Sequence, residues 1–249
     1  MDHITQIKNQ LNKDHHKNLF FTKKIPPAWE FPGVHIDHFA VKETTVNYNE
    51  INITYNNLGY RSDFNYAIDS LKNKDCILCL GDSDTFGRVI HLNDLWTTHI
   101  SKLYPDYNVL NLGIPGAAAD SVSRIGANTI SALEGAVKIV LVLWPSYHRR
   151  EFVNKDFIGA VYKTPDDKEL VPFENYWDTI DWKSNSYNFY KNKQFIESVC
   201  SANNIKYYGL EINRDSPIIK NDFKNEYLSF GNDTQLAIAN YFEERLRSI

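Results

Sequence analysis

The sequence predicts an α/β fold: a three-layer α/β/α sandwich on a mostly parallel sheet of about five strands, preceded by an N-terminal extension. From residue 75 onward, short unbroken apolar runs rich in Val, Ile and Leu are typical of strands buried on both faces. Segments with helical spacing separate these runs, and such alternation favours parallel strands covered by helices on both sides. The 249 residues, 43% of them hydrophobic, suffice for one large core.

Four apolar runs are the expected core strands. They are CILCLG, YNVLNLG, VKIVLVLW and IKYYGL, at residues 76–81, 107–113, 137–144 and 205–210. The expected helices lie between and after them, at residues 94–104, 120–133, 188–204 and 233–249. In such a sheet ligands bind at the carboxyl ends of the strands, so the residues just after each run are the candidates for function.

Residues 1–70 are expected to form an extension packed on a core domain that spans residues 71–249. The extension is rich in Asn, Lys, Tyr and His, and it contains two possible short strands at residues 34–41 and 51–57.

Charge and the start of the chain exclude several classes of partner. The net charge of −4 gives no basic surface of the kind that binds nucleic acid. The first residues are charged and polar, without the apolar segment of a secretory signal or a membrane span. We therefore expect a cytoplasmic protein with neither nucleic acid nor membrane as partner.

Cysteines and histidines give no sign of a disulfide framework or a metal site. The three cysteines, Cys76, Cys79 and Cys200, are an odd number, and the first two lie inside an apolar run. They are expected to be buried small hydrophobes. His35 and His38 are too few to hold a metal, so no metal and no cofactor are expected.

The stretch GDSDTFG, residues 81–87, follows the first core strand and raises the question of what Ser83 does. A serine in this position often only caps a helix. A phosphate loop is not indicated, because both GxxxxGK[ST] and GxGxxG are missing, and the GxSxG frame of the nucleophile elbow is missing too. Ser83, Gly113 and Pro145 each follow a strand of the same predicted sheet, which favours a shared crevice.

These blocks resemble the SGNH, or GDSL, hydrolase family. Residues 81–87 fit its first block, GDSxTxG, at every fixed position, and residues 111–113, Asn-Leu-Gly, are similar to its second block, Asn-x-Gly. The stretch 57–61, NLGYR, is similar to an Asn-x-x-Gly-x-Arg segment that many members carry. The resemblance covers about residues 50–249 and implies the flavodoxin-like SGNH fold.

The resemblance implies a role for each matched position. It makes Ser83 the nucleophile, with the helix that starts there helping to stabilise developing negative charge. It makes the backbone N–H groups of Ser83 and Gly113 two donors of an oxyanion hole, although Gly113 could equally serve a tight turn. Asp82 and Asn111, from the same two blocks, join the predicted binding residues.

The third block departs from the family. Gly-x-Asn-Asp is expected after the third strand, but Trp-Pro-Ser-Tyr stands at residues 144–147. Ser146 is the substitute donor that the sequence offers to the oxyanion hole. His148, Arg149 and Arg150 follow and place positive charge near the strand end, with a solvated basic loop as the alternative reading.

The fourth block departs most. Members of the family carry Asp-x-x-His before the last helix, and here Glu226 and Ser229 stand at those positions, with no histidine anywhere after His148. A serine hydroxyl needs a base, so His148 becomes the best substitute and Glu226 and Asp222 the carboxylate candidates. The His35–His38 segment reaches the site only if the extension folds over it.

Three functions therefore stand as hypotheses. The first is a serine ester hydrolase with catalytic residues Ser83, His148 and Glu226, acting on acyl or acetyl esters of small molecules or carbohydrates. The second is a catalytically inactive binding module, and the third is an acyltransferase. The aromatic stretch 173–190 either walls a cleft for such substrates or forms a buried insertion. No oligomeric state is predicted.

Overall fold

The structure is a computed structural model that describes residues 44–48, 51–147, 149–153, 158–162, 182–212, 218–219 and 230–247. The possible strand at 34–41 lies outside these residues, and so do the predicted site residues His148 and Glu226.

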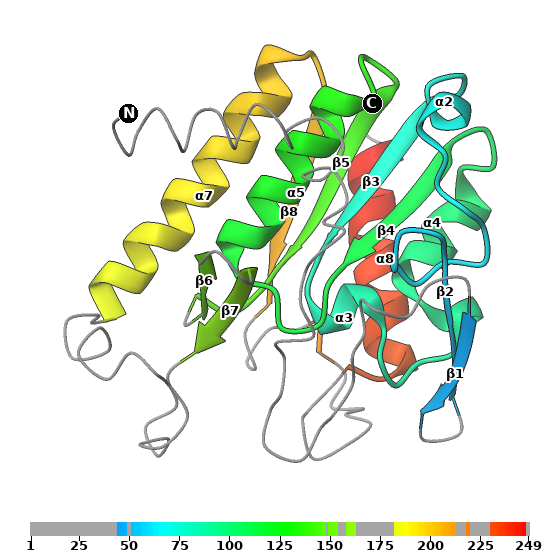
Figure 1. Cartoon of the computed structure of the whole chain (residues 1–249), viewed down its shortest axis with the longest axis horizontal. Coiled ribbons are helices and arrows are strands. Elements are labelled where there is room, and N and C mark those ends of the chain that lie inside the picture. Colours follow the sequence, from blue (N-terminus) through cyan, green and yellow to red (C-terminus); the bar gives the residue numbers. More distant parts are fainter. Residues whose placement is uncertain are drawn as a thin grey trace, which may run out of the picture.

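The core is a parallel sheet in the order β4-β3-β5-β8 (Figure 1). Its strands are β3 (Cys76–Gly81), β4 (Asn108–Gly113), β5 (Val137–Trp144) and β8 (Lys206–Glu211), within one residue of the four apolar runs. The α/β prediction is confirmed, but the sheet has four strands in the described residues rather than about five. These four strands are the four apolar runs of the sequence; β3 is buried throughout, whereas the edge strand β8 is buried only at Leu210.

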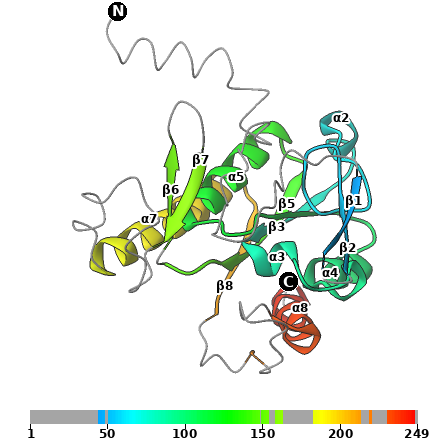
Figure 2. The same cartoon turned by 60° about the horizontal axis from the view of Figure 1, so that its bottom comes forward.

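Helices cover both faces of the sheet (Figure 2). On one face lie α5 (Ala119–Ala132) and α7 (Trp182–Ala202), and on the other α4 (Trp96–Leu103) and α8 (Asn232–Arg247). Each was predicted from its apolar spacing. No helix among the described residues is long and apolar enough to cross a membrane.

The middle strand β3 shows how the sequence builds the two layers of core. All six of its residues are buried. Leu78 and Leu80 pack in the cluster that contains Ile125 of α5, while Ile77 and Cys79 pack in the cluster with Phe242 of α8. Alternate side chains of one strand thus reach opposite helix layers, as the period of a strand requires.

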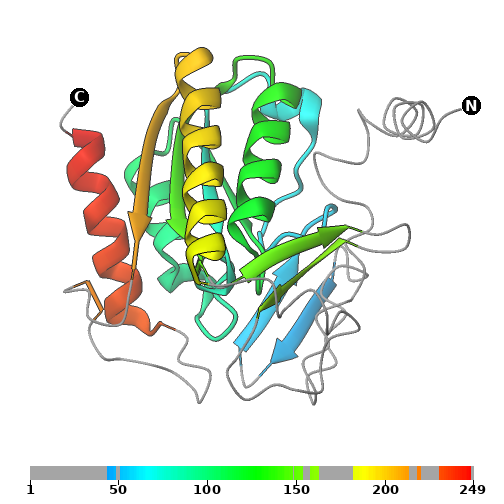
Figure 3. The same ribbon diagram turned by 90° about the vertical axis from the view of Figure 1, so that its left-hand side faces the viewer.

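Two antiparallel hairpins lie near the end of the molecule where the parallel strands finish (Figures 1 and 3). One pairs β1 (Thr44–Tyr48) with β2 (Ile51–Tyr55), and the other pairs β6 (Arg149–Val153) with β7 (Ile158–Tyr162). The strand expected at 51–57 is confirmed as β2, whereas β1, β6 and β7 were not predicted. The short elements are α2 (Ile68–Leu71), α3 (Ser83–Phe86) and the 3₁₀ turn η1 (Leu92–Asp94).

Cys76, Cys79 and Cys200 are free and buried, as expected. Burial raises the pKa of the Cys76 thiol to about 11, so this thiol is protonated at neutral pH.

The aromatic stretch 173–190 is described from residue 182, where it forms the first turns of α7. Phe189 is buried there, whereas Tyr187 and Tyr190 are exposed.

Candidate functional site

Ser83 lies at the point where the order of the parallel strands reverses. The chain goes from β3 outward to β4 and returns to the other side of β3 as β5, so the carboxyl end of β3 is the switch point of the sheet. Ligands of doubly wound sheets bind at such points. Ser83 follows β3 after a single residue, begins α3 and is only partly buried.

Gly81 permits the tight passage from β3 into α3. A Cβ on Gly81 would lie 2.1 Å from Thr85 Oγ1 and 2.7 Å from the carbonyl oxygen of Leu143. The Thr85 hydroxyl also donates to the carbonyl of Leu80, at 3.4 Å. The first block of the family pattern therefore has a local structural reason, which is the close packing of this turn.

The helix that begins at Ser83 is short. It has four residues and ends at Gly87, which has φ 78° in the left-handed region. So short a helix sums few peptide dipoles, and the expected dipole contribution to oxyanion stabilisation is accordingly small. Individual N–H groups remain the donors to consider, and neither the hydroxyl nor the N–H of Ser83 bonds to any described residue.

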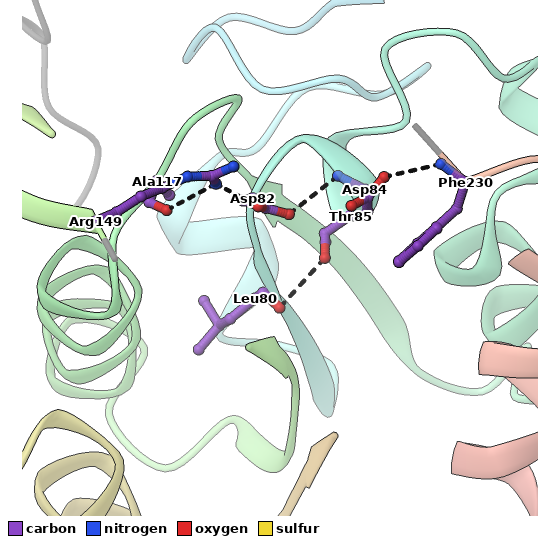
Figure 4. A network of polar contacts seen from close by, with 7 residues as sticks. All are labelled: Leu80, Asp82, Asp84, Thr85, Ala117, Arg149 and Phe230. Atoms are coloured by element: carbon purple, nitrogen blue, oxygen red, sulfur yellow. Dashed lines mark hydrogen bonds and ion pairs between the residues drawn. The ribbon is translucent and has the colours of Figure 1, made fainter. Parts of the chain in front are cut away.

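Asp82, the cap of α3, is held by Arg149 (Figure 4). Its Oδ2 accepts from Arg149 Nη1 at 2.5 Å, and its Oδ1 accepts from the backbone N–H of Asp84 at 3.2 Å. Arg149 Nη1 also donates to the carbonyl of Ala117, in the loop after β4, at 3.3 Å. Arg149 is thus not part of a solvated basic loop, because it joins β6, α3 and the loop after β4.

Contacts between β6 and the helices α5 and α7 fix the position of Arg149. Glu151 forms two hydrogen bonds with Arg124 of α5, at 3.0 and 2.5 Å. Arg150 Nε donates to Asn185 of α7 at 3.0 Å. Two successive neighbours of Arg149 are therefore anchored, which directs its guanidinium toward α3.

Asn111 and Gly113, from the second block, hold β4 against α3. Asn111 Nδ2 donates to the carbonyl of Thr85 at 3.0 Å, and Asn111 Oδ1 accepts from the N–H of Gly113 at 3.0 Å. Asn111 is buried, with 6% of its surface exposed, and its amide positions α3. The Gly113 N–H, predicted as an oxyanion donor, is already engaged and must exchange this partner to serve that role.

Replacing Gly113 by alanine is expected to destabilise the protein. The added Cβ would lie 2.3 Å from the backbone nitrogen of Phe86 and 2.7 Å from the carbonyl carbon of Thr85, so backbone has to move. Overpacking of this kind costs about 1–3 kcal/mol. For a chain of this size the melting temperature should fall by about 3–10 °C.

Gly126→Ala is the matched control for that measurement. The Cβ added in α5 would meet only side-chain tips, Leu80 Cδ1 at 2.7 Å and Ile196 Cδ1 at 2.9 Å. Such tips move aside more easily than backbone, and alanine favours the helix. A fall in melting temperature no larger in Gly113→Ala than in Gly126→Ala would contradict the close approach of α3 and β4.

Asp84 was not predicted as a site residue, yet its carboxyl lies within the site. Asp84 Oδ1 accepts from the backbone N–H of Phe230, in the segment just before α8, at 3.2 Å. Burial, together with the neighbouring Asp82 carboxylate, raises the pKa of Asp84 to about 7. Only its adjacency to Ser83 signalled it in the sequence, since it occupies a variable position of GDSxTxG.

The remaining predicted residues are not brought together in the described part of the chain. Ser146 is exposed in the loop after β5, and its carbonyl accepts from the N–H of Arg149 at 3.3 Å. His148, Asp222, Glu226 and Ser229 lie outside the described residues, so their roles stay predictions. Within the described residues, no three His, Cys, Asp or Glu side chains are grouped to hold a metal.

Comparisons with known proteins add little to this site. No family model and no curated protein matches the chain. Among solved structures, the chain is similar to a "putative lipolytic protein of G-D-S-L family" from Desulfitobacterium hafniense DCB-2. The identity is 14% and the TM-score 0.31, over 69% of this chain and 99% of that one. A likeness this distant carries no argument about function.

Proposed function

We propose that the protein is a serine ester hydrolase of the SGNH/GDSL type, acting on acyl or acetyl esters of small molecules or carbohydrates. One observation carries the proposal: in the GDSDTFG stretch, Ser83 follows the inner strand β3 after a single residue, at the switch point of a parallel sheet. The second block supports it, because Asn111 and Gly113 pack against the same turn.

In the proposed reaction, the Ser83 oxygen attacks the acyl carbon of the ester, and the alcohol leaves from an acyl-enzyme that water then hydrolyses. The Ser83 N–H, at the first position of α3, has no partner within the helix and is the first oxyanion donor. The Gly113 N–H is the second donor once it turns from Asn111 Oδ1.

Covalent labelling of Ser83 tests the proposal. A fluorophosphonate reacts with an activated serine as the serine oxygen bonds to phosphorus, fluoride leaves and the hydroxyl proton passes to a base. We expect a single phosphonate adduct on the peptide that contains Ser83, together with hydrolysis of nitrophenyl acetate. An intact protein that takes up no label at Ser83 would contradict the proposal.

The binding-module hypothesis is the second candidate, and two observations favour it. The Gly113 N–H bonds to Asn111 instead of facing a ligand, and the sequence has no histidine in the family's fourth block. A protein of this class binds a glycan or a protein partner without turnover and without labelling at Ser83. The same experiment therefore separates the two functions.

A further inference from the structure

The carboxyl of Asp84 contacts the residue that follows, in the sequence, the position at which the SGNH resemblance implies a histidine. Figure 4 shows the Asp82 and Asp84 side chains leaving the same turn in different directions, one to Arg149 and the other to Phe230. Phe230 immediately follows Ser229, the position at which the resemblance implies a histidine. Asp84 is also the next residue after Ser83 in the same helical turn.

One further hydrogen bond fixes Asp84 relative to α8. Gln235, buried in the first turn of α8, donates from Nε2 to the main-chain carbonyl of Asp84 at 2.9 Å. Its Oε1 accepts from the backbone N–H of Trp96 at 2.9 Å, which ties the same amide to the start of α4. The turn that carries Ser83 and Asp84 is therefore held to α8 by the Asp84 carbonyl and to the segment just before α8 by the Asp84 side chain.

The neighbouring charges distinguish Asp84 from Asp82. The Asp82 carboxylate forms an ion pair with the Arg149 guanidinium. Asp84 has no such counter-ion in direct contact among the described residues, where its carboxyl accepts a hydrogen bond from the Phe230 N–H. The charged groups that act on it are Asp82, which raises its pKa, and Arg149, which lowers it.

From this placement we infer that Asp84 is the general base of the proposed hydrolase, so the inference rests on the proposed function. The Asp84 carboxylate takes the proton from the Ser83 hydroxyl, directly or through one water, as the serine oxygen bonds to the acyl carbon. The proton then passes to the leaving alcohol oxygen as the ester C–O bond breaks. In the second half, the same carboxylate takes a proton from the water that hydrolyses the acyl-enzyme and returns it to the serine oxygen.

A base of this kind gives the reaction a defined dependence on pH. Because the pKa of Asp84 is raised to about 7, its carboxyl is mostly neutral at pH 5 and mostly ionised at pH 8. A base near the working pH can both accept and return a proton. Hydrolysis should rise with pH up to about pH 7 and fall about tenfold for each pH unit below it.

Asp84→Asn tests the inference while keeping the hydrogen bond to Phe230, since the amide oxygen still accepts from that N–H. We expect kcat for nitrophenyl acetate, and the rate of fluorophosphonate labelling at Ser83, to fall by about a hundred-fold or more, with KM changed by less than about three-fold. Asp233→Asn, the same chemical change on exposed surface in the first turn of α8, is the control and should leave both rates unchanged.

Two variants give a signature that a structural role would not produce. Asp82→Asn keeps an acceptor for the Asp84 N–H but removes the negative charge, so the acidic limb of the pH profile should move down by about one unit. Arg149→Gln removes the positive charge, so the limb should move up. Shifts in these opposite directions support Asp84 as the titrating base. If the acidic limb of the pH profile stays in place in both variants, the assignment of Asp84 as the base is wrong.

The protonation of the Asp84 carboxyl can also be followed by the pH dependence of the melting temperature, which requires no turnover. A carboxyl whose pKa is raised by folding binds more protons in the folded state, so it lowers stability as pH rises from about 4 through 7. The melting temperature of Asp84→Asn minus that of the wild type should therefore increase from pH 5 to pH 8. A difference that stays constant over this range shows that the carboxyl is ionised throughout and overturns the inference.

The outcomes separate this inference from the proposed function. If Ser83 is labelled in the wild type and Asp84→Asn is labelled and turns over at the wild-type rate, the hydrolase stands and Asp84 is only a structural contact to Phe230. If the wild type takes up no label, the proposed function fails and Asp84 as its base fails with it.

Discussion

Alanine at position 83 is expected to lower the hydrolysis of nitrophenyl acetate by at least about a hundred-fold, to the background of the buffer. The change removes the only atom proposed to bond to the acyl carbon. The Ser83 side chain bonds to no described residue, so its loss should leave the fold and the melting temperature intact. Initial rates and circular dichroism, taken on the same preparation, check both parts.

Ser70→Ala is the matched control, because Ser70 is an exposed serine of α2, outside the proposed site. Its hydrolysis rate should equal that of the wild type. If Ser83→Ala hydrolyses the ester as fast as Ser70→Ala does, the activity belongs to another residue. The proposal that Ser83 is the nucleophile of an esterase is then wrong.

Replacing Arg61 by methionine is expected to cost about 3 kcal/mol of stability, from the unsatisfied carbonyls that it leaves. Arg61 is 1% exposed. Its guanidinium donates to the carbonyls of Phe86 at 3.4 Å, of Ile90 at 2.5 Å, and of Gly87 at the end of α3. The melting temperature should fall by about 6–12 °C for a chain of this length.

The cost is large because each partner of Arg61 is buried backbone. Burial lowers the pKa of Arg61 to about 10, yet the group still carries its charge at neutral pH. Methionine fills similar space but donates nothing, so the carbonyls after α3 lose their donor where water does not replace it. Because these carbonyls close the turn that starts at Ser83, labelling of Ser83 should slow in the same variant.

Arg247→Met supplies the comparison on the surface. Arg247 pairs with Glu243 one turn earlier in α8, and its side chain is 72% exposed. Exposed pairs of this spacing are worth about 0.3–0.5 kcal/mol. A loss in Arg61→Met no greater than that in Arg247→Met would show that the guanidinium does not hold the end of α3.

The apolar runs were enough to predict the core of the fold. Each of the four strands and four long helices was located from local periodicity, since a strand such as Cys76–Gly81 that is buried on both faces is apolar throughout. The hairpin β6–β7 was missed because its first strand, Arg149–Val153, begins with three charged residues. Those charges are satisfied by partners on the cap of α3, the loop after β4, α5 and α7.

The sequence by itself determined the position of Ser83 and its neighbours in the blocks of residues 81–87 and 111–113, because a tight strand-to-helix turn restricts which residues fit. Only the tertiary structure decided what surrounds them. In the folded chain Asp82 pairs with Arg149, 67 residues away, and the Asn111 amide donates to a carbonyl of α3. Phe230 contacts Asp84 across 146 residues. Proton affinity depends on burial and on charges close in space, and a sequence specifies these only once the chain has folded.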